Sequence, residues 1–121
     1  MSDAVEDPAG SVTVHPSVVV TVARLTALAT PGVARLGHST RGRRMRRMLA
    51  PPGGDGVDLR MCDGALAVDL HVVAEAEANL VRLGQALQTE VQRAIRELVG
   101  MEVREVNVTI QDVDIPLARA T

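Results

Sequence analysis

The histidines and the cysteine are the residues of this sequence that could bind a metal or act as nucleophiles. The chain has three histidines, His15, His38 and His71, and none is paired in the H-x-x-x-H spacing that puts two ligands on one helix face. Cys62 is the single cysteine, and one thiol can form neither an internal disulfide nor a zinc cage. We therefore expect no metal site, no cofactor and no catalytic residue.

Two aspartates could form an acid–base pair, since one of two neighbouring carboxylates holds its proton more tightly. We expect Asp58 and Asp69 to face each other across a hairpin, with Arg60 one step away. The adjacent arginine and a water-facing strand surface favour a screened polar cluster instead. Because no nucleophile, base and orienting group converge in the pattern, we expect no enzymatic activity.

A run of arginines is the most distinctive chemistry of the chain. All 13 basic residues are arginine, and six of them fall within residues 33–54, a segment without any of the 15 acidic residues. Arginines flank the apolar Met45, Met48 and Leu49, a basic amphipathic pattern that suits an anionic surface. The candidate interaction residues are Arg41, Arg43, Arg44, Arg46 and Arg47. Anionic lipid, nucleic-acid phosphate or an acidic protein face could bind them, and a merely solvated loop is the alternative.

Length and composition limit the classes of protein to consider. With 121 residues and 46% hydrophobic residues, the chain is one globular domain. It contains no Phe, Trp or Tyr, so the core is aliphatic and there is no aromatic platform for stacking bases. The start of the chain is acidic, which is the wrong charge for a secretory signal, and no apolar run is long enough to span a membrane. We therefore expect a cytoplasmic protein.

Apolar spacing predicts the elements in the first half of the chain. Val12 and Val14 alternate with polar residues, which predicts a short strand over residues 11–14. His15 and Pro16 then indicate a helix start, and the helix ends at Pro31. Residues 33–36 form a brief strand, and residues 37–55 form an irregular basic loop. The apolar positions that recur at helical spacing in the helix are Val18, Val22, Leu25 and Ala29.

A hairpin is the clearest local signal of the second half. Asp63 and Gly64 tolerate the positive φ angles of a two-residue turn between strands over residues 56–62 and 65–73. This turn pairs Met61 with Leu66, Leu59 with Val68 and Val57 with Leu70, so one face of the hairpin is apolar. The opposite face carries Asp58, Arg60, Asp69 and His71. The alternation therefore predicts a sheet with one polar face.

An amphipathic helix and a closing strand complete the chain. Asn79 can cap the helix and Gly100 can end it. The apolar stripe of this helix is Leu80, Leu83, Leu87, Val91, Ile95 and Leu98, and the residues that face away are Arg82, Gln85, Gln88, Gln92, Arg93 and Arg96. A strand follows over residues 103–111. We predict an α+β fold of two layers, with two amphipathic helices packed on one face of a small mixed or antiparallel sheet.

The domain organisation follows from these elements. We expect a flexible leader over residues 1–10, one domain over residues 11–113 and a tail over residues 114–121. The unpaired edge of the last strand and the valine-rich first helix predict a homo-oligomer.

Taken together in this order, the motifs resemble the alkaline shock protein family of bacterial envelope-stress proteins. The resemblance covers residues 11–113, and its most specific parts are the Pro31-Gly32-Val33 turn and the closing sequence VGMEVREVNVTI. It implies a small noncatalytic cytoplasmic protein that self-associates. It also implies that the protein can be held at the inner face of the membrane by an integral-membrane partner. The alternative function is a small nucleic-acid-binding domain that uses the basic loop.

Overall fold

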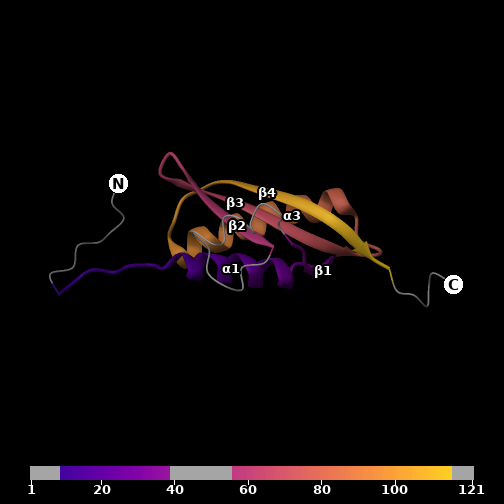
Figure 1. Ribbon diagram of the computed structural model, residues 1–121, viewed down its shortest axis with the longest axis horizontal. Coiled ribbons are helices and arrows are strands. Elements are labelled where there is room, and N and C mark those ends of the chain that lie inside the picture. The colour runs from indigo at the N-terminus through magenta and orange to yellow at the C-terminus, as the bar shows by residue number, and fades with distance from the viewer. Residues whose placement is uncertain (1–8, 39–55, 116–121) are drawn as a thin grey trace.

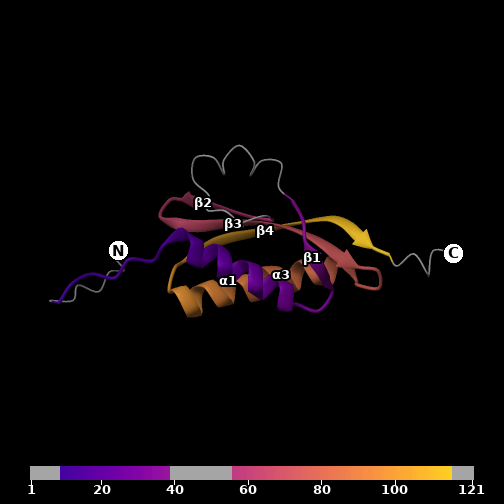
Figure 2. The ribbon, with the colours of Figure 1, turned by 60° about the horizontal axis from the view of Figure 1, so that its bottom comes forward.

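The protein has two layers, a sheet and a pair of helices that cover one face of it. The structure is a computed structural model and describes residues 9–38 and 56–115. Its sheet has four strands, and both helices lie on the same side of that sheet (Figures 1 and 2). The α+β prediction is confirmed. Residues 1–8, the five candidate arginines and residues 116–121 lie outside the described residues.

The first helix, α1 (Pro16–Ala29), begins where the sequence predicts. His15 caps it by accepting a hydrogen bond from the Ser17 N–H through its ring nitrogen, at 3.3 Å. The predicted strand over residues 11–14 is wrong, since these residues are exposed and pair with no described strand. The alternation of Val12 and Val14 favours an extended backbone, but none of the four described strands lies beside it.

The apolar stripe predicted for α1 is also wrong. The buried residues are Val19, Val20, Ala23 and Ala27, so the helix is rotated from the face that the spacing of Val18 and Leu25 suggested. The error arises because α1 is apolar on nearly every side, and periodicity then cannot tell which side faces the core.

The hairpin of β2 (Val57–Cys62) and β3 (Ala65–Glu75) has the predicted register. Val57 pairs with Leu70, Leu59 with Val68 and Met61 with Leu66. Asp63 and Gly64 have φ angles of 52° and 83°, as a two-residue turn with positive φ requires.

β3 is the centre of the sheet. β1 (Val33–Leu36) and β2 both pair with it in antiparallel fashion, β1 along Val72 to Ala74 and β2 along Ala65 to Leu70. β4 (Val103–Asp114) pairs with β3 in parallel fashion along nearly its whole length. β1 and β2 therefore lie end to end on one edge of β3, with β4 on the other edge, and the sheet is mixed.

The second helix is α3 (Leu80–Ala94), which continues as the π-helical turn η1 (Ile95–Val99). Asn79 caps the start by accepting from the Arg82 N–H at 3.0 Å, and Gly100 ends the helix with a φ of 83°. Both caps are as predicted. At the end of the chain, β4 continues past the expected end at residue 111, and Asp114 still pairs with Glu75.

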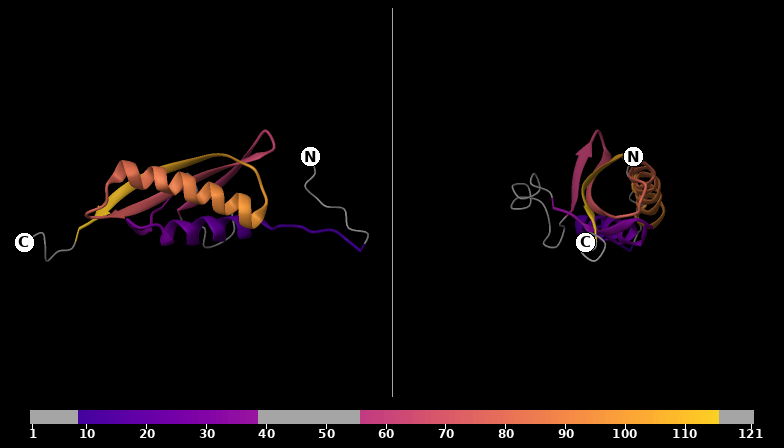
Figure 3. Two further views of the ribbon diagram at one scale, coloured as in Figure 1. Left: turned by 180° about the vertical axis from the view of Figure 1, so that it is seen from behind. Right: turned by 90° about the vertical axis from the view of Figure 1, so that its right-hand side faces the viewer.

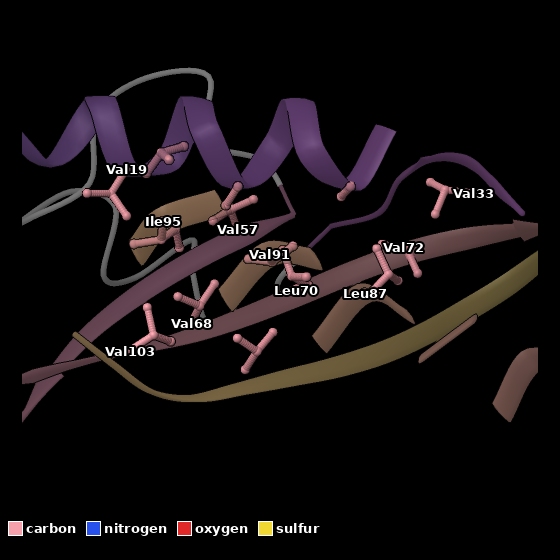
Figure 4. Close-up of a cluster of buried hydrophobic side chains, with 14 of the residues drawn as sticks. Val19, Val33, Val57, Val68, Leu70, Val72, Leu87, Val91, Ile95 and Val103 are labelled. Atoms are coloured by element: carbon pink, nitrogen blue, oxygen red, sulfur yellow. The ribbon is translucent and has the colours of Figure 1, made fainter. Parts of the chain in front are cut away.

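The core is aliphatic and lies between the helices and the sheet (Figure 4). Its largest fully buried side chains are Leu70, Leu87, Ile95, Val68, Val72 and Val91. Gly32 explains the Pro31-Gly32 turn after α1, because it has a φ of 104° and a Cβ there would lie 3.2 Å from Leu83. Leu80 and Leu98, expected in the core stripe, are 40% and 75% exposed because they lie at the two ends of the helix.

Candidate interaction surfaces

A polar cluster occupies the face of the sheet that the helices leave uncovered. Asp58 and Asp69 are register partners, as predicted. The guanidinium of Arg60 donates two hydrogen bonds to the Asp69 carboxylate, at 3.1 and 3.2 Å, and a third to Glu105 at 3.4 Å. The hydrogen bond to Asp69 and the negative charge of that residue raise the pKa of Arg60. The guanidinium therefore stays charged whenever the protein is folded.

Asn107, His71 and Asp58 complete this cluster, and Oδ2 of Asp58 and Nδ1 of His71 are buried without a hydrogen-bond partner among the described residues. The side-chain amide of Asn107 donates to Asp69 at 2.9 Å and to Glu105 at 3.1 Å. Nε2 of His71 lies 3.6 Å from Oδ2 of Asp58, and their side chains are 18% and 16% exposed. Each of the two facing aspartates thus has a cationic or ionisable partner of its own. The arrangement supports the prediction of a screened cluster, because Arg60 neutralises the charge of Asp69 and His71 lies beside Asp58.

The histidines and the cysteine lie on different elements of the fold. His15 caps α1, His38 follows β1, and His71 lies on the polar face of β3. Cys62 is a free, partly buried thiol at the end of β2. Within residues 9–38 and 56–115, no three His, Cys, Asp or Glu side chains gather where they could hold a metal ion.

The outward side of α1 is the second surface of interest, and it is apolar. Val18, Leu25 and Leu28 are 44%, 56% and 43% exposed. With the exposed Thr21, these positions follow a spacing of three, four and three residues, the spacing of a seam between packed helices. Arg24 is the only charged residue of the helix. A helix that is apolar on both sides normally has both sides covered, and the described residues cover only the inner side.

The outward side of α3 is polar in its middle. Arg82, Gln85, Thr89, Arg93 and Arg96 are exposed along it, and exposed apolar residues occur only near its ends. Gln88 and Gln92, which the sequence places on the solvent side, instead reach β4 and donate to the carbonyl oxygens of Val106 and Val103, each at 3.2 Å. Figure 3 shows α3 beside β4. α1 lies on the same face of the sheet and packs nearer to β1 and β2.

The five candidate arginines, Arg41, Arg43, Arg44, Arg46 and Arg47, lie outside the described residues, but both ends of their segment are described. The Gly37 N–H donates to the carbonyl of His71 at 2.6 Å, and the His71 N–H donates to the carbonyl of Gly56 at 2.8 Å. The side chain of Gln111 also exchanges hydrogen bonds with the backbone of His38. The segment therefore leaves and rejoins the sheet at a single residue of β3, as an insertion between two collinear strands.

The apolar outward side of α1 is the surface that sequence reasoning assigned wrongly. Three members of the predicted stripe, Val18, Leu25 and Ala29, are exposed, whereas Val22 packs against the core. A signal was present in the sequence, because apolar residues also occupy positions 19, 20, 23 and 27 of the helix. Two apolar stripes on one helix indicate two contacts, one inside the fold and one outside it.

The chain shows similarity to a known family and to known structures. Residues 4–115 match the alkaline shock protein 23 family, described by its cell envelope-related function. A search of curated proteins found no significant match. No helix of the described residues is long and apolar enough to cross a membrane.

Solved structures similar to this chain include forms of the MamM C-terminal domain. A cysteine-to-serine variant has a TM-score of 0.52 at 14% identity, covering 84% of this chain and 100% of that one. A nickel form has a TM-score of 0.50 at 13% identity, covering 81% of this chain and 99% of that one. At this identity the similarity concerns the fold alone.

Proposed function

The chain belongs to the alkaline shock protein 23 family, whose function is related to the cell envelope, and from this premise we propose that it is a noncatalytic protein that acts by self-association. In this proposal two copies pack through the outward side of α1. The assembly works at the inner face of the cell membrane, which it reaches through an integral-membrane partner or through anionic lipid. No step of this function requires a metal, a cofactor or turnover.

The observation that carries the proposal is the exposed apolar stripe of Val18, Leu25 and Leu28. Each side chain that moves from about half exposed to buried contributes about 1 kcal/mol, since full burial of a Val or Leu is worth about 1.5–3 kcal/mol. A symmetric pair of stripes buries both sets at once. Three residues on each of two helices therefore contribute about 6 kcal/mol, which offsets much of the entropic cost of association, so further contacts must add to a stable dimer.

A second copy suits this stripe better than a charged partner. α1 has no acidic residue and one arginine, Arg24, which is partly buried. The stripe thus offers little charge for a partner to complement, and a twofold axis through it places like apolar residues against each other. An anionic lipid surface would find only this one cation on the helix, whereas lipid-binding helices carry several.

In the second part of the proposal, the five arginines of the basic segment bind an anionic membrane surface. Near an anionic membrane each arginine adds about 1 kcal/mol of attraction, which high salt removes. The assembly multiplies this attraction, because each copy brings its own segment. Phosphate of a nucleic acid is the alternative ligand, and binding assays with anionic vesicles and with duplex or single-stranded nucleic acid distinguish the two.

The decisive experiment is sedimentation of the protein over a hundredfold concentration range, as the parent chain and as two variants. Leu25→Glu places a charge in the stripe on α1, and Gln85→Glu places the same charge on the polar outward side of α3. We expect the parent and Gln85→Glu to associate with concentration and Leu25→Glu to remain monomeric with an unchanged circular dichroism spectrum. A parent that stays monomeric, or equal association of both variants, contradicts the proposal.

A further inference from the structure

The further inference concerns the outer edge of β4, whose two halves differ. Gln88 and Gln92 of α3 donate to the carbonyls of Val106 and Val103. These carbonyls must point away from β3, because a carbonyl that faces β3 is taken by the ladder between the strands. The first half of the edge is therefore partly covered by the helix, which is one way in which proteins block edge pairing.

The second half of the edge has no such cover. Alternate residues of a strand direct both backbone groups to the same side, so Val108 and Ile110 face the same outer edge as Val106. No hydrogen bond from a described side chain or strand reaches this edge at those two residues. Their side chains are only partly buried at the border of the core. The edge thus has free donors and acceptors beside an incompletely covered apolar surface.

The segment before α1, residues 11–14, is called the arm here, and its properties complement those of the β4 edge. Residues 11–14 alternate Ser, Val, Thr and Val, a pattern typical of strands, yet they make no hydrogen bond within the described residues. Val12 is 75% exposed and Val14 is 42% exposed. Figures 1 and 2 show the arm leaving the body at the start of α1, while the second half of β4 runs toward the other end of the molecule. The arm therefore cannot pair with the edge of its own chain.

We infer that the arm of one copy, Ser11–Val14, adds as an extra strand to the edge of β4 around Val108 and Ile110 in a second copy. In this arrangement Val12 and Val14 lie on the helix side beside Val108 and Ile110, and Thr13 lies on the polar side beside Thr109. The arm has no charged residue, whereas pairing two β4 edges would bring both copies of Asp112 into one short ladder. Neutrality therefore favours the arm as the occupant.

This inference deepens the proposed self-association and rests on it. The test uses cysteine pairs in a Cys62→Ser background, with two differently tagged populations mixed under mild oxidation. One population carries Thr13→Cys and the other carries Thr109→Cys. The matched control replaces the second with Val81→Cys, on a residue that is 71% exposed at the start of α3. We expect a mixed disulfide between positions 13 and 109 and none between 13 and 81.

A second variant separates the arm from the remaining interface. Thr13→Pro removes the backbone donor that faces β4 when Val12 pairs with Val108 and Val14 with Ile110 in parallel, and so it blocks strand pairing. We expect the fold to remain unchanged, because no described residue of the same chain pairs with residue 13. We expect it to raise the dissociation constant about tenfold, which corresponds to about 1.4 kcal/mol. Equal disulfide yields at positions 109 and 81, or unchanged association of Thr13→Pro, would overturn the inference about the arm. The proposed role of α1 would still hold if Leu25→Glu dissociates the protein. A parent that never associates overturns both.

Discussion

α1 and α3 lie side by side on the same face of one sheet, yet they differ on their outward sides. Both bury an aliphatic stripe against the sheet, with Ala23 and Ala27 from α1 and Leu87 and Val91 from α3. Outside, α3 presents arginine and glutamine, whereas α1 presents Val18, Leu25 and Leu28. The buried sides of both helices stabilise the fold in the same way. A difference in role between the helices must therefore come from their exposed sides.

The contrast extends to how the two helices are held. α3 has an asparagine cap, a glycine stop and glutamine contacts to β4, so its position is fixed by polar groups within the chain. α1 has a histidine cap and ends at Thr30, whose hydroxyl donates to the carbonyl of Thr26 at 2.9 Å. Polar groups within the chain thus hold α3 in place, whereas the described residues leave the outward side of α1 uncovered, as the proposed self-association requires.

The largest expected effect is a loss of stability on substitution of a residue on the buried side of a helix. Leu87 is completely buried, so Leu87→Ala should lower the free energy of unfolding by about 2–5 kcal/mol through lost transfer energy and a cavity. Leu25→Ala should change it by less than about 0.5 kcal/mol in the dissociated protein, as is usual at the surface. Urea unfolding at low protein concentration measures both. Equal losses would mean that the outward stripe of α1 is part of the folded core.

The next effect concerns the end of the second helix. Gly100 has a φ of 83° and open space where a Cβ would lie, so Gly100→Ala strains the backbone without any clash. A left-handed backbone costs a residue with a side chain about 1–2 kcal/mol, and thermal unfolding should show this loss. Thr30→Gly at the end of α1 should not stabilise the protein, because Thr30 has an extended backbone with a negative φ, which does not favour glycine. A neutral Gly100→Ala would show that the helix end rearranges.

Removing the N-cap of α3 should destabilise the protein more than removing the N-cap of α1. Asn79→Ala should destabilise the protein by about 1 kcal/mol, the usual value of an N-cap asparagine. His15→Ala should cost less, because its hydrogen bond is longer, at 3.3 Å against 3.0 Å for Asn79. Chemical denaturation of the two variants tests this order. A greater loss for His15→Ala would contradict the view that α1 is the less firmly anchored helix.

The smallest effect on stability is expected from the basic segment on the β1–β2 side of the sheet. Replacing Arg43, Arg44, Arg46 and Arg47 with glutamine should change the free energy of unfolding by less than about 1 kcal/mol, as surface changes usually do. It should also leave sedimentation unchanged. Co-sedimentation with anionic vesicles at low salt should fall, and neutral vesicles serve as the control. A variant that fails to fold would make the segment structural, and one that binds vesicles as before would make it only solvated charge.

The sequence predicted most of the elements because local signals agreed with the global fold. The Asp63-Gly64 turn set the register of the hairpin, and the caps at Asn79 and Gly100 set the limits of the second helix. The same reasoning failed for α1, because a helix with apolar residues on both sides has no period that selects its buried side. It also failed for residues 11–14, since a strand requires a neighbouring strand, which alternation alone cannot supply. The end-to-end arrangement of β1 and β2 depends on their long-range pairing with β3, which local patterns in the sequence cannot predict.

The most direct test of the central claim is the reactivity of a thiol placed on each helix. In a Cys62→Ser background, Leu25→Cys reports on the outward side of α1 and Gln85→Cys on the outward side of α3. Both are modified with a water-soluble thiol reagent as the protein concentration rises. The account predicts that the thiol at position 25 becomes protected with increasing concentration while the thiol at position 85 reacts at a constant rate. Equal and constant reaction rates at both positions would contradict it.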